Sequence, residues 1–190
     1  MIYGDAGGNN MNPIPAIAAY AAMLKEAGEP LYFPGKEGLQ GLREAVDADL
    51  VASALSWAAT SQAAWGNTYN LTNGDVFVWP HVWGAIADVF GMEPGDDRPI
   101  SLVEELPKMQ QQWAALVEKY NLRSPKDIVE FAGYNSIVYA DMVLSGGSRG
   151  PVPALNSTIA ARLDGFHDCI DTEDMFRKWF SRLREDRWVP

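Results

Sequence analysis

The side chains able to act on a substrate or bind a metal are few in this chain of 190 residues. Its two histidines, His81 and His167, form no cluster with Cys169 or with carboxylates at the spacing of metal ligands, so no zinc or iron site is expected. No Gly-x-Ser-x-Gly elbow supports a nucleophilic serine. Asp47 and Asp49 have the spacing of residues that cap helices or form turns, which favours a structural role over an acid-base pair.

Reduction with a dinucleotide cofactor requires two further features. One is a glycine-rich turn for the pyrophosphate, and the other is a tyrosine with a lysine four residues later that handles the substrate proton. Tyr20 is followed by Lys25, one residue too far, and Tyr120 is followed by Ser124. The glycines within residues 4–8 do not have dinucleotide-binding spacing. We therefore expect no complete cofactor cradle and no Tyr-Lys pair in this chain.

Composition and charge limit the classes of partner. An apolar fraction of 47% indicates a folded globular protein, and the net charge of -10 opposes binding to nucleic acids and to anionic membranes. The densest basic cluster lies within residues 177–187, where cations suit the negative end of a helix and indicate a solvated face. A single cysteine excludes an internal disulfide, and the N-terminus lacks the pattern of a signal peptide, so we expect a cytoplasmic protein.

The first half of the sequence alternates strand and helix patterns. Pro13 begins an alanine-rich segment that Gly28 ends, and Asp47 or Asp49 caps the next helix. Alternation of polar and apolar residues ahead of Asn73-Gly74 predicts a strand and a turn. The predicted order is a strand over residues 1–3, a helix over 13–27, strands over 31–33 and 42–46, a helix over 47–57, a strand over 69–72 and a helix from Pro80 to Gly91.

From Ser101 onward the sequence predicts helices alone. Ser101 and Glu104 match a capping box, and Pro107 separates this first turn from a helix with an apolar stripe. Further helices are predicted over residues 124–144, after Ser157, and from Asp171 onward. The change of pattern near residues 94–99 divides the chain into an α/β part over residues 1–95 and a helical part over residues 96–190.

Several blocks of sequence are similar to one enzyme family. They are Asp47-Ala48-Asp49 before an alanine-rich helix, Asn70–Trp79, Trp83–Gly91, and the closing segment from Gly165-Phe166 to Pro190. Together they resemble the extended short-chain dehydrogenase/reductases of the progesterone 5β-reductase and iridoid synthase-like group, in the C-terminal half only. The resemblance implies the C-terminal part of a Rossmann-type α/β fold, in which residues 1–95 are a residual part of the Rossmann-like domain and residues 96–190 are a mainly helical substrate-binding lobe.

The resemblance also implies contacts with a cofactor. In that family the strand end and the loop beyond the catalytic Tyr-Lys region lie along the nicotinamide side of NADP. The matching positions here are Ile2, Asn9, Asn10 and Met11. The alternative is a simple turn, because glycine and asparagine tolerate positive φ. No catalytic residue is implied within this chain.

A second landmark of the family is a helix whose aromatic residues line a pocket for an apolar enone or dialdehyde. The segment Ile137–Asp141 resembles this helix, with Tyr139 in the place of a family aromatic. Phe131 and Tyr134 are further candidates for substrate contacts. Two aliphatic residues precede Tyr139 where the family has bulky aromatics, which puts its best-known substrates in doubt for this chain. The alternative is that Tyr139 is a core aromatic at helical spacing.

The resemblance implies the substrate-binding C-terminal portion of an NAD(P)H-dependent oxidoreductase, and specifically an enone reductase. The nucleotide-binding half and the Tyr-Lys pair are expected on other polypeptide. The alternative is a noncatalytic module derived from this fold, which binds a small apolar molecule or a partner chain. A strand over residues 1–3 that begins the chain would leave a parallel sheet edge exposed. We therefore expect a longer natural protein, a nucleotide-binding partner chain or a homo-oligomer.

Overall fold

The computed structural model describes residues 1–4, 11–35, 41–145 and 155–190, which form a mixed α/β structure dominated by helices. Its strands in these ranges are β1 (Ile2–Tyr3), β2 (Leu31–Phe33), β3 (Val46–Asp47) and β4 (Pro94–Asp97). β1 pairs in parallel with β3, and β2 pairs in parallel with β4. Because each sheet has only two short strands, helix packing supplies most of the core.

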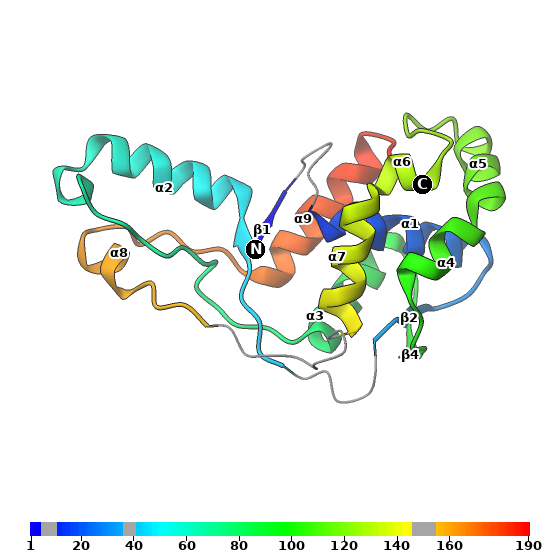
Figure 1. Cartoon of the computed structure of the whole chain (residues 1–190), viewed down its shortest axis with the longest axis horizontal. Helices are drawn as coiled ribbons and strands as arrows, with labels where there is room; N and C mark the ends of the chain where they lie inside the picture. Colours follow the sequence, from blue (N-terminus) through cyan, green and yellow to red (C-terminus); the bar gives the residue numbers. More distant parts are fainter. Residues whose placement is uncertain (5–10, 36–40, 146–154) are drawn as a thin grey trace.

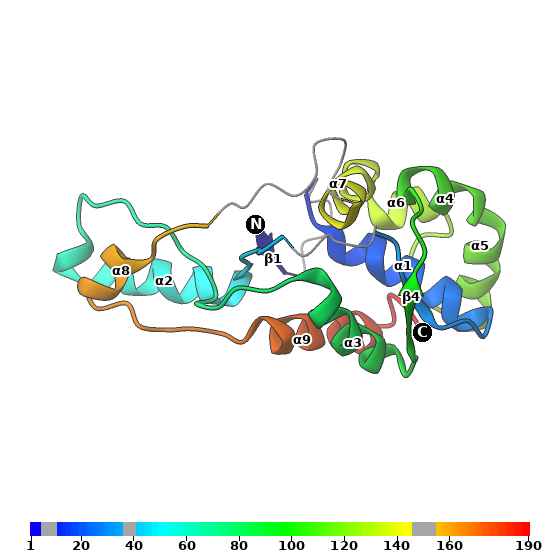
Figure 2. The same cartoon turned by 90° about the horizontal axis from the view of Figure 1, so that it is seen from below.

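The helices divide between a body and an arm (Figures 1 and 2). The body contains α1 (Pro13–Glu26), α3 (Trp79–Phe90), α4 (Leu102–Lys108), α5 (Gln110–Lys119), α6 (Ile128–Ala132), α7 (Tyr134–Ser145) and α9 (Thr172–Glu185). The arm contains α2 (Ala48–Thr60), the short 3-10 helix η1 (Gln62–Ala64) and α8 (Ile159–Leu163). No helix in the described ranges is both long and apolar enough to cross a membrane.

Helix α1 is the centre of the body. Nearly all of its side chains are buried, and its alanines allow α3, α6, α7 and α9 to approach closely. The predicted limits are confirmed at both ends. The side chain of Asn12 accepts a hydrogen bond from the Ile14 amide at 3.2 Å, and Gly28 follows the helix with φ 71°. The signals for α3 are also confirmed, since Pro80 lies in its first turn and Gly91 ends it with φ 64°.

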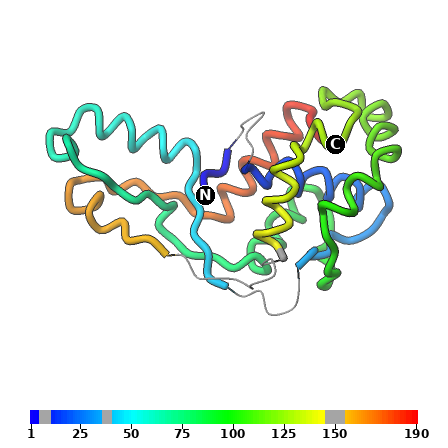
Figure 3. The backbone as a smooth tube through the Cα atoms, viewed as in Figure 1, coloured from blue at the N-terminus to red at the C-terminus, as the bar shows by residue number. Residues whose placement is uncertain are grey.

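The arm has a small hydrophobic cluster of its own. Leu50 and Ala54 on α2 pack with Ala161 on α8 and with Phe166, which follows α8. The ring of Trp57 on α2 lies 5.4 Å from that of Phe166. The chain between η1 and α3 runs back along the arm to the body (Figure 3). Residues far apart in sequence thus hold the arm together.

Two predicted strands differ from the structure. The strand predicted over residues 69–72 is wrong, because this part of the chain joins no ladder. Side chains attach it instead: the Tyr69 hydroxyl donates to the Asp164 carboxylate at 2.7 Å, and Leu71 packs on the arm cluster. The strand predicted over residues 42–46 is reduced to an isolated antiparallel bridge between Arg43 and Phe77, followed by β3. Alternating polarity therefore reflected two environments rather than sheet pairing.

The predicted helix over residues 124–144 is divided in two. Gly133, with φ 77°, separates α6 from α7, a conformation that side chains other than glycine rarely adopt. Pro107 was expected to separate two helices, but it lies inside α4 and the break comes at Met109. The segment around residues 94–99 was predicted only as a boundary, yet it forms β4, because the edge of β2 supplies a pairing partner that local sequence does not reveal.

A buried polar network joins α2 to α9. Asp47 is fully buried, and its carboxylate caps α2 by accepting from the Asp49 amide at 2.7 Å. The same carboxylate lies 2.6 Å from the Lys178 ammonium and accepts from the indole N–H of Trp179 at 3.2 Å. The Asp47 amide donates to the side-chain oxygen of Asn73 at 2.7 Å. Every polar group of Asp47 is therefore satisfied without water.

Replacement of Asp47 by alanine is expected to lower the free energy of unfolding by about 2–3 kcal/mol, because it removes a helix cap and one partner of a buried ion pair. Lys178 is partly exposed, so hydration limits the loss. Asp49→Ala is the matched control, because Asp49 pairs with the same lysine from an exposed position, and its cost should stay within about 0.5 kcal/mol. Urea unfolding measures both. Equal losses in the two variants would contradict this account of the network.

Candidate functional site

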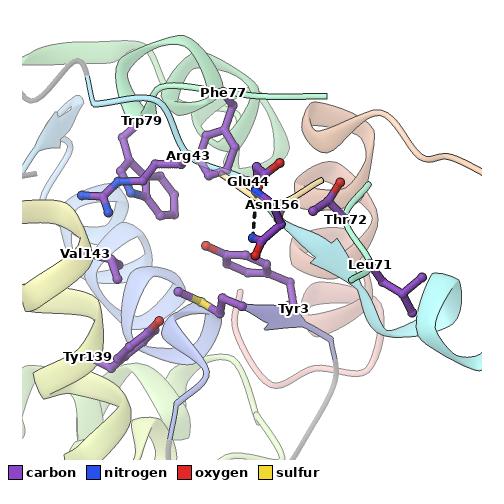
Figure 4. A pocket seen from close by; sticks show the side chains of 12 residues that line it. Tyr3, Arg43, Glu44, Leu71, Thr72, Phe77, Trp79, Tyr139, Val143 and Asn156 are labelled. Carbon is purple, nitrogen blue, oxygen red and sulfur yellow. Dashed lines mark hydrogen bonds between the residues drawn. The ribbon is translucent and has the colours of Figure 1, made fainter. Parts of the chain in front are cut away.

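A pocket of about 190 Å³ lies between β1, α7 and the start of α3 (Figure 4). Tyr3 reaches it from β1, Tyr139 and Val143 from α7, and Trp79 from the first position of α3. The remaining lining residues come from irregular segments: Met1, Arg43, Glu44, Ala45, Leu71, Thr72, Phe77 and Asn156. The pocket therefore draws on both halves of the sequence.

Aromatic rings fix the apolar wall of the pocket. The rings of Phe77 and Trp79 meet edge to face, with centroids 5.3 Å apart and planes at 89°. Phe176 on α9 supports this wall from behind, with its ring 5.1 Å from Tyr3 and 5.4 Å from Trp79. Because these rings are buried in one cluster, their positions are set by packing rather than by the loop that carries them.

Polar groups lie beside this wall (Figure 4). The backbone of Arg43 both donates to and accepts from that of Phe77, at 2.8 and 2.9 Å, so this bridge holds the arginine beside the aromatic wall. The Glu44 carboxylate accepts from the amide and the side chain of Asn156, at 2.7 and 2.9 Å. The indole N–H of Trp79 is buried and has no hydrogen-bond partner within the described part of the chain. An unpaired buried donor is unusual in a folded protein, and this one is sealed behind the ring that lines the pocket.

Burial keeps the two pocket phenols neutral. It raises the pKa of Tyr3 far above the ordinary value, and the neighbouring Tyr139 raises it further, while Arg43 lowers it. Burial also raises the pKa of Tyr139, which Arg43 again opposes. At neutral pH both side chains therefore offer O–H groups that donate and accept hydrogen bonds. Neither has the pKa near 7 that suits a general acid or base.

The predicted substrate residues differ in location. Tyr139 lines the pocket. Phe131 stacks on Trp113, with ring centroids 4.8 Å apart, and Tyr134 is 59% exposed. Neither belongs to the lining of this pocket.

Most of the lining residues were missed, among them Arg43 and Trp79. Tyr3 was expected, with Ile2, in the segment along the nicotinamide and not as a lining residue of a substrate pocket. The available signal for Trp79 was a tryptophan directly before a helix-starting proline.

The predicted cofactor residues are only partly described. Ile2 and Met11 are 52% and 55% exposed, whereas Asn9 and Asn10 lie outside the described residues. Ile2 precedes Tyr3 on β1, and the pleat directs the two side chains to opposite faces. The exposed face with Ile2 is thus separate from the face that lines the pocket.

Three of the described helix starts, those of α1, α2 and α9, do not fit a pyrophosphate. The first turn of α1 contains Pro13 and Pro15, which lack amide protons, and Asn12 already caps Ile14. Acidic residues occupy the starts of α2 and α9, where they would repel phosphate. The described residues also contain no group of three or more side chains that could hold a metal ion. A dinucleotide would have to bind its phosphates elsewhere.

Asp141, the aspartate that follows Tyr139, was expected by resemblance to line a substrate pocket. Its carboxylate instead accepts hydrogen bonds from the Ser101 hydroxyl and the Leu102 amide, both at 2.9 Å. These bonds tie α7 to the start of α4. Asp141 therefore positions the helix that carries Tyr139, and it is not among the residues that line the described pocket.

Comparison with known proteins gives similarity along the whole chain. It is 30% identical to the 3-oxo-Delta(4,5)-steroid 5-beta-reductase of Arabidopsis thaliana, of which it covers 48%. It is 34% identical to the (S)-8-oxocitronellyl enol synthase CYC2 of Camptotheca acuminata and 30% identical to the (S)-8-oxocitronellyl enol synthase of Catharanthus roseus, each covered to 48%. The chain thus spans about half the length of the curated relatives it matches. No model of a protein family matches it.

The raised pKa values predict how stability depends on pH. The unfolded chain releases tyrosine protons near pH 10, whereas folded Tyr3 and Tyr139 retain theirs. Their contribution to stability is therefore complete below about pH 10 and is lost as the pH rises further. Urea unfolding at about pH 9 and about pH 11 should show a smaller decrease in Tyr3→Phe than in the unmodified protein. An identical decrease in both would contradict the neutral, buried state of Tyr3.

Proposed function

We propose that the chain is the substrate-binding C-terminal portion of an NAD(P)H-dependent oxidoreductase. The support is its similarity, along its whole length, to the progesterone 5β-reductase and iridoid synthase-like short-chain dehydrogenase/reductases. In this proposal residues 1–95 are the residual part of a Rossmann-like domain. Residues 96–190 form the helical substrate lobe. The nucleotide-binding half and the Tyr-Lys pair belong to polypeptide outside these 190 residues.

The pocket between Tyr3 and Tyr139 is the observation that carries this proposal. Its aromatic wall suits an apolar molecule, and its neutral phenols can donate hydrogen bonds to a carbonyl oxygen. An enone has this combination of an apolar body and one polar end. We therefore propose reduction of the carbon-carbon double bond of an enone as the reaction of the complete protein.

The role of this chain is to hold and orient the substrate. NADPH, once bound, supplies the hydride. Ile2, Asn9, Asn10 and Met11 are proposed to border only the nicotinamide, since the starts of α1, α2 and α9 do not suit the phosphates. Tyr139 is proposed to contact the substrate, and Phe131 and Tyr134 to support or border it. The chain on its own is expected to be inactive.

A fusion protein tests the proposal. We would join the N-terminal half of the Arabidopsis thaliana relative to this chain and measure NADPH consumption with a 3-oxo-Δ4,5-steroid. The fusion should be active and the chain alone inactive. Tyr139→Ala in the fusion should lower kcat/KM about tenfold or more, because it removes a wall and a donor of the pocket.

Two controls make the result specific. Tyr120→Ala should leave kcat/KM within about twofold, because Tyr120 is an exposed tyrosine bonded to Glu26 and does not line the pocket. Tyr139→Phe removes the hydroxyl and keeps the ring, so its kcat/KM separates the contributions of the two groups. Submicromolar binding of NADPH by the unfused chain, measured by fluorescence, would refute the proposal that the cofactor phosphates bind to the other half of the protein. A folded but inactive fusion would argue against the enone reductase assignment.

A further inference from the structure

We propose that this pocket recognises a carboxylate on a small apolar molecule, with Arg43 as the opposing charge and the hydroxyls of Tyr3 and Tyr139 as further donors. This role rests on the proposed function, because it takes the pocket as the substrate site. The expected substrate then bears an acid group as well as an apolar body.

Arg43 has no carboxylate partner within the described ranges. Its backbone bridge to Phe77 fixes where the side chain starts, and the residue lines the pocket. Among the described residues of the lining, Glu44 alone is acidic, and its carboxylate oxygen already accepts two hydrogen bonds from Asn156. The pocket therefore contains a guanidinium charge that its own acidic residue does not neutralise through an ion pair.

The indole of Trp79 forms part of the apolar wall. Its side chain is 1% exposed, and the residue lines the same pocket. Its Nε1 is sealed among the packed side chains and has no hydrogen-bond partner in the described structure, so the nitrogen does not open onto the cavity. The ring therefore reports on occupancy of the pocket, and the donors come from Arg43 and the two phenols.

The phenols complete the set of donors. Tyr3 and Tyr139 both lie close enough to Arg43 for its charge to lower their pKa, although burial dominates and keeps them neutral. The pocket thus brings together a guanidinium and two neutral hydroxyls (Figure 4). The two oxygens of a carboxylate have about four acceptor positions, which matches this supply.

Two other ligand classes fit less well. An enone without an acid group can accept from the phenols but offers Arg43 no ion-pair partner. A phosphate carries about two negative charges at neutral pH, more than a carboxylate, and would place them beside Glu44 in a protein whose net charge is already -10. A monocarboxylate supplies one negative charge for one guanidinium. The apolar wall of Phe77 and Trp79 then accommodates its hydrocarbon part.

Phenylacetate is a suitable probe, with phenylacetamide as its neutral isostere. Titration of the chain with each compound would be followed through the indole Nε1–H resonance of Trp79 in nitrogen-proton NMR spectra, assigned with Trp79→Phe. Phenylacetate should shift this resonance in a saturable manner, and phenylacetamide should bind about tenfold more weakly or worse. Arg43→Gln should weaken phenylacetate binding by a similar factor. Arg43→Lys should lose less affinity, because lysine keeps the positive charge but lacks the paired N–H donors of the guanidinium.

Arg98→Gln is the matched control, because it removes the same charge from an arginine that pairs with Glu29 outside the pocket. Its affinity for phenylacetate should stay within about twofold of the unmodified protein. Equal affinities for the acid and the amide, an unchanged affinity in a folded Arg43→Gln protein, or no shift at millimolar phenylacetate would each overturn the inference. These titrations need no cofactor and no fused half. Their result is therefore independent of whether the fusion protein is active.

Discussion

All the hydrogen-bonding groups of Asn73 are used between segments that are distant in sequence. Its amide donates to the carbonyl of Ala45 at 2.7 Å, and its carbonyl accepts from the amide of Ile170 at 2.9 Å. Its side-chain oxygen accepts from Asp47, and its side-chain nitrogen donates to Thr172. Because Asn73 is fully buried, none of these bonds can be exchanged for water. The register of β3, the start of α9 and the path into α3 all depend on it.

The pocket follows from this arrangement. Asn73 and Asp47 hold the segment after residue 42 against the segment before α3, which brings Arg43 beside Phe77 and Trp79. Helix α7 closes the other side, anchored to α4 through Asp141. The result combines a rigid aromatic wall with a guanidinium and two neutral hydroxyls. Similarity to reductases and enol synthases concerns the whole chain, whereas this set of donors is a property of a few side chains.

Local signals predicted the helices well and the strands poorly. Asp47 and Asp171 lie at helix starts where the sequence indicated, and Pro13 begins α1 as expected, because these signals need only neighbouring residues. Strand pairing depends on a distant partner, so the alternation over residues 69–72 produced no strand, while β4 formed beside β2 without a clear signal. The blocks of similar sequence likewise predicted a relative of one reductase family. The chain matches about half the length of the relatives found.

For the site, the sequence by itself showed no dinucleotide-binding glycine spacing, and it identified Tyr139 as a candidate. The expectation that no Tyr-Lys spacing occurs was wrong, because Lys36 lies four residues after Tyr32; Tyr32 belongs to β2, and Lys36 lies outside the described residues. Only the tertiary structure decided that Tyr139 meets Tyr3, Arg43 and Trp79 around one cavity, while Phe131 lies against Trp113. The physical reason is that residue types and spacings specify local hydrogen bonds. Burial, and with it the protonation of a phenol or the lack of a partner for an indole, depends on which distant segments pack together.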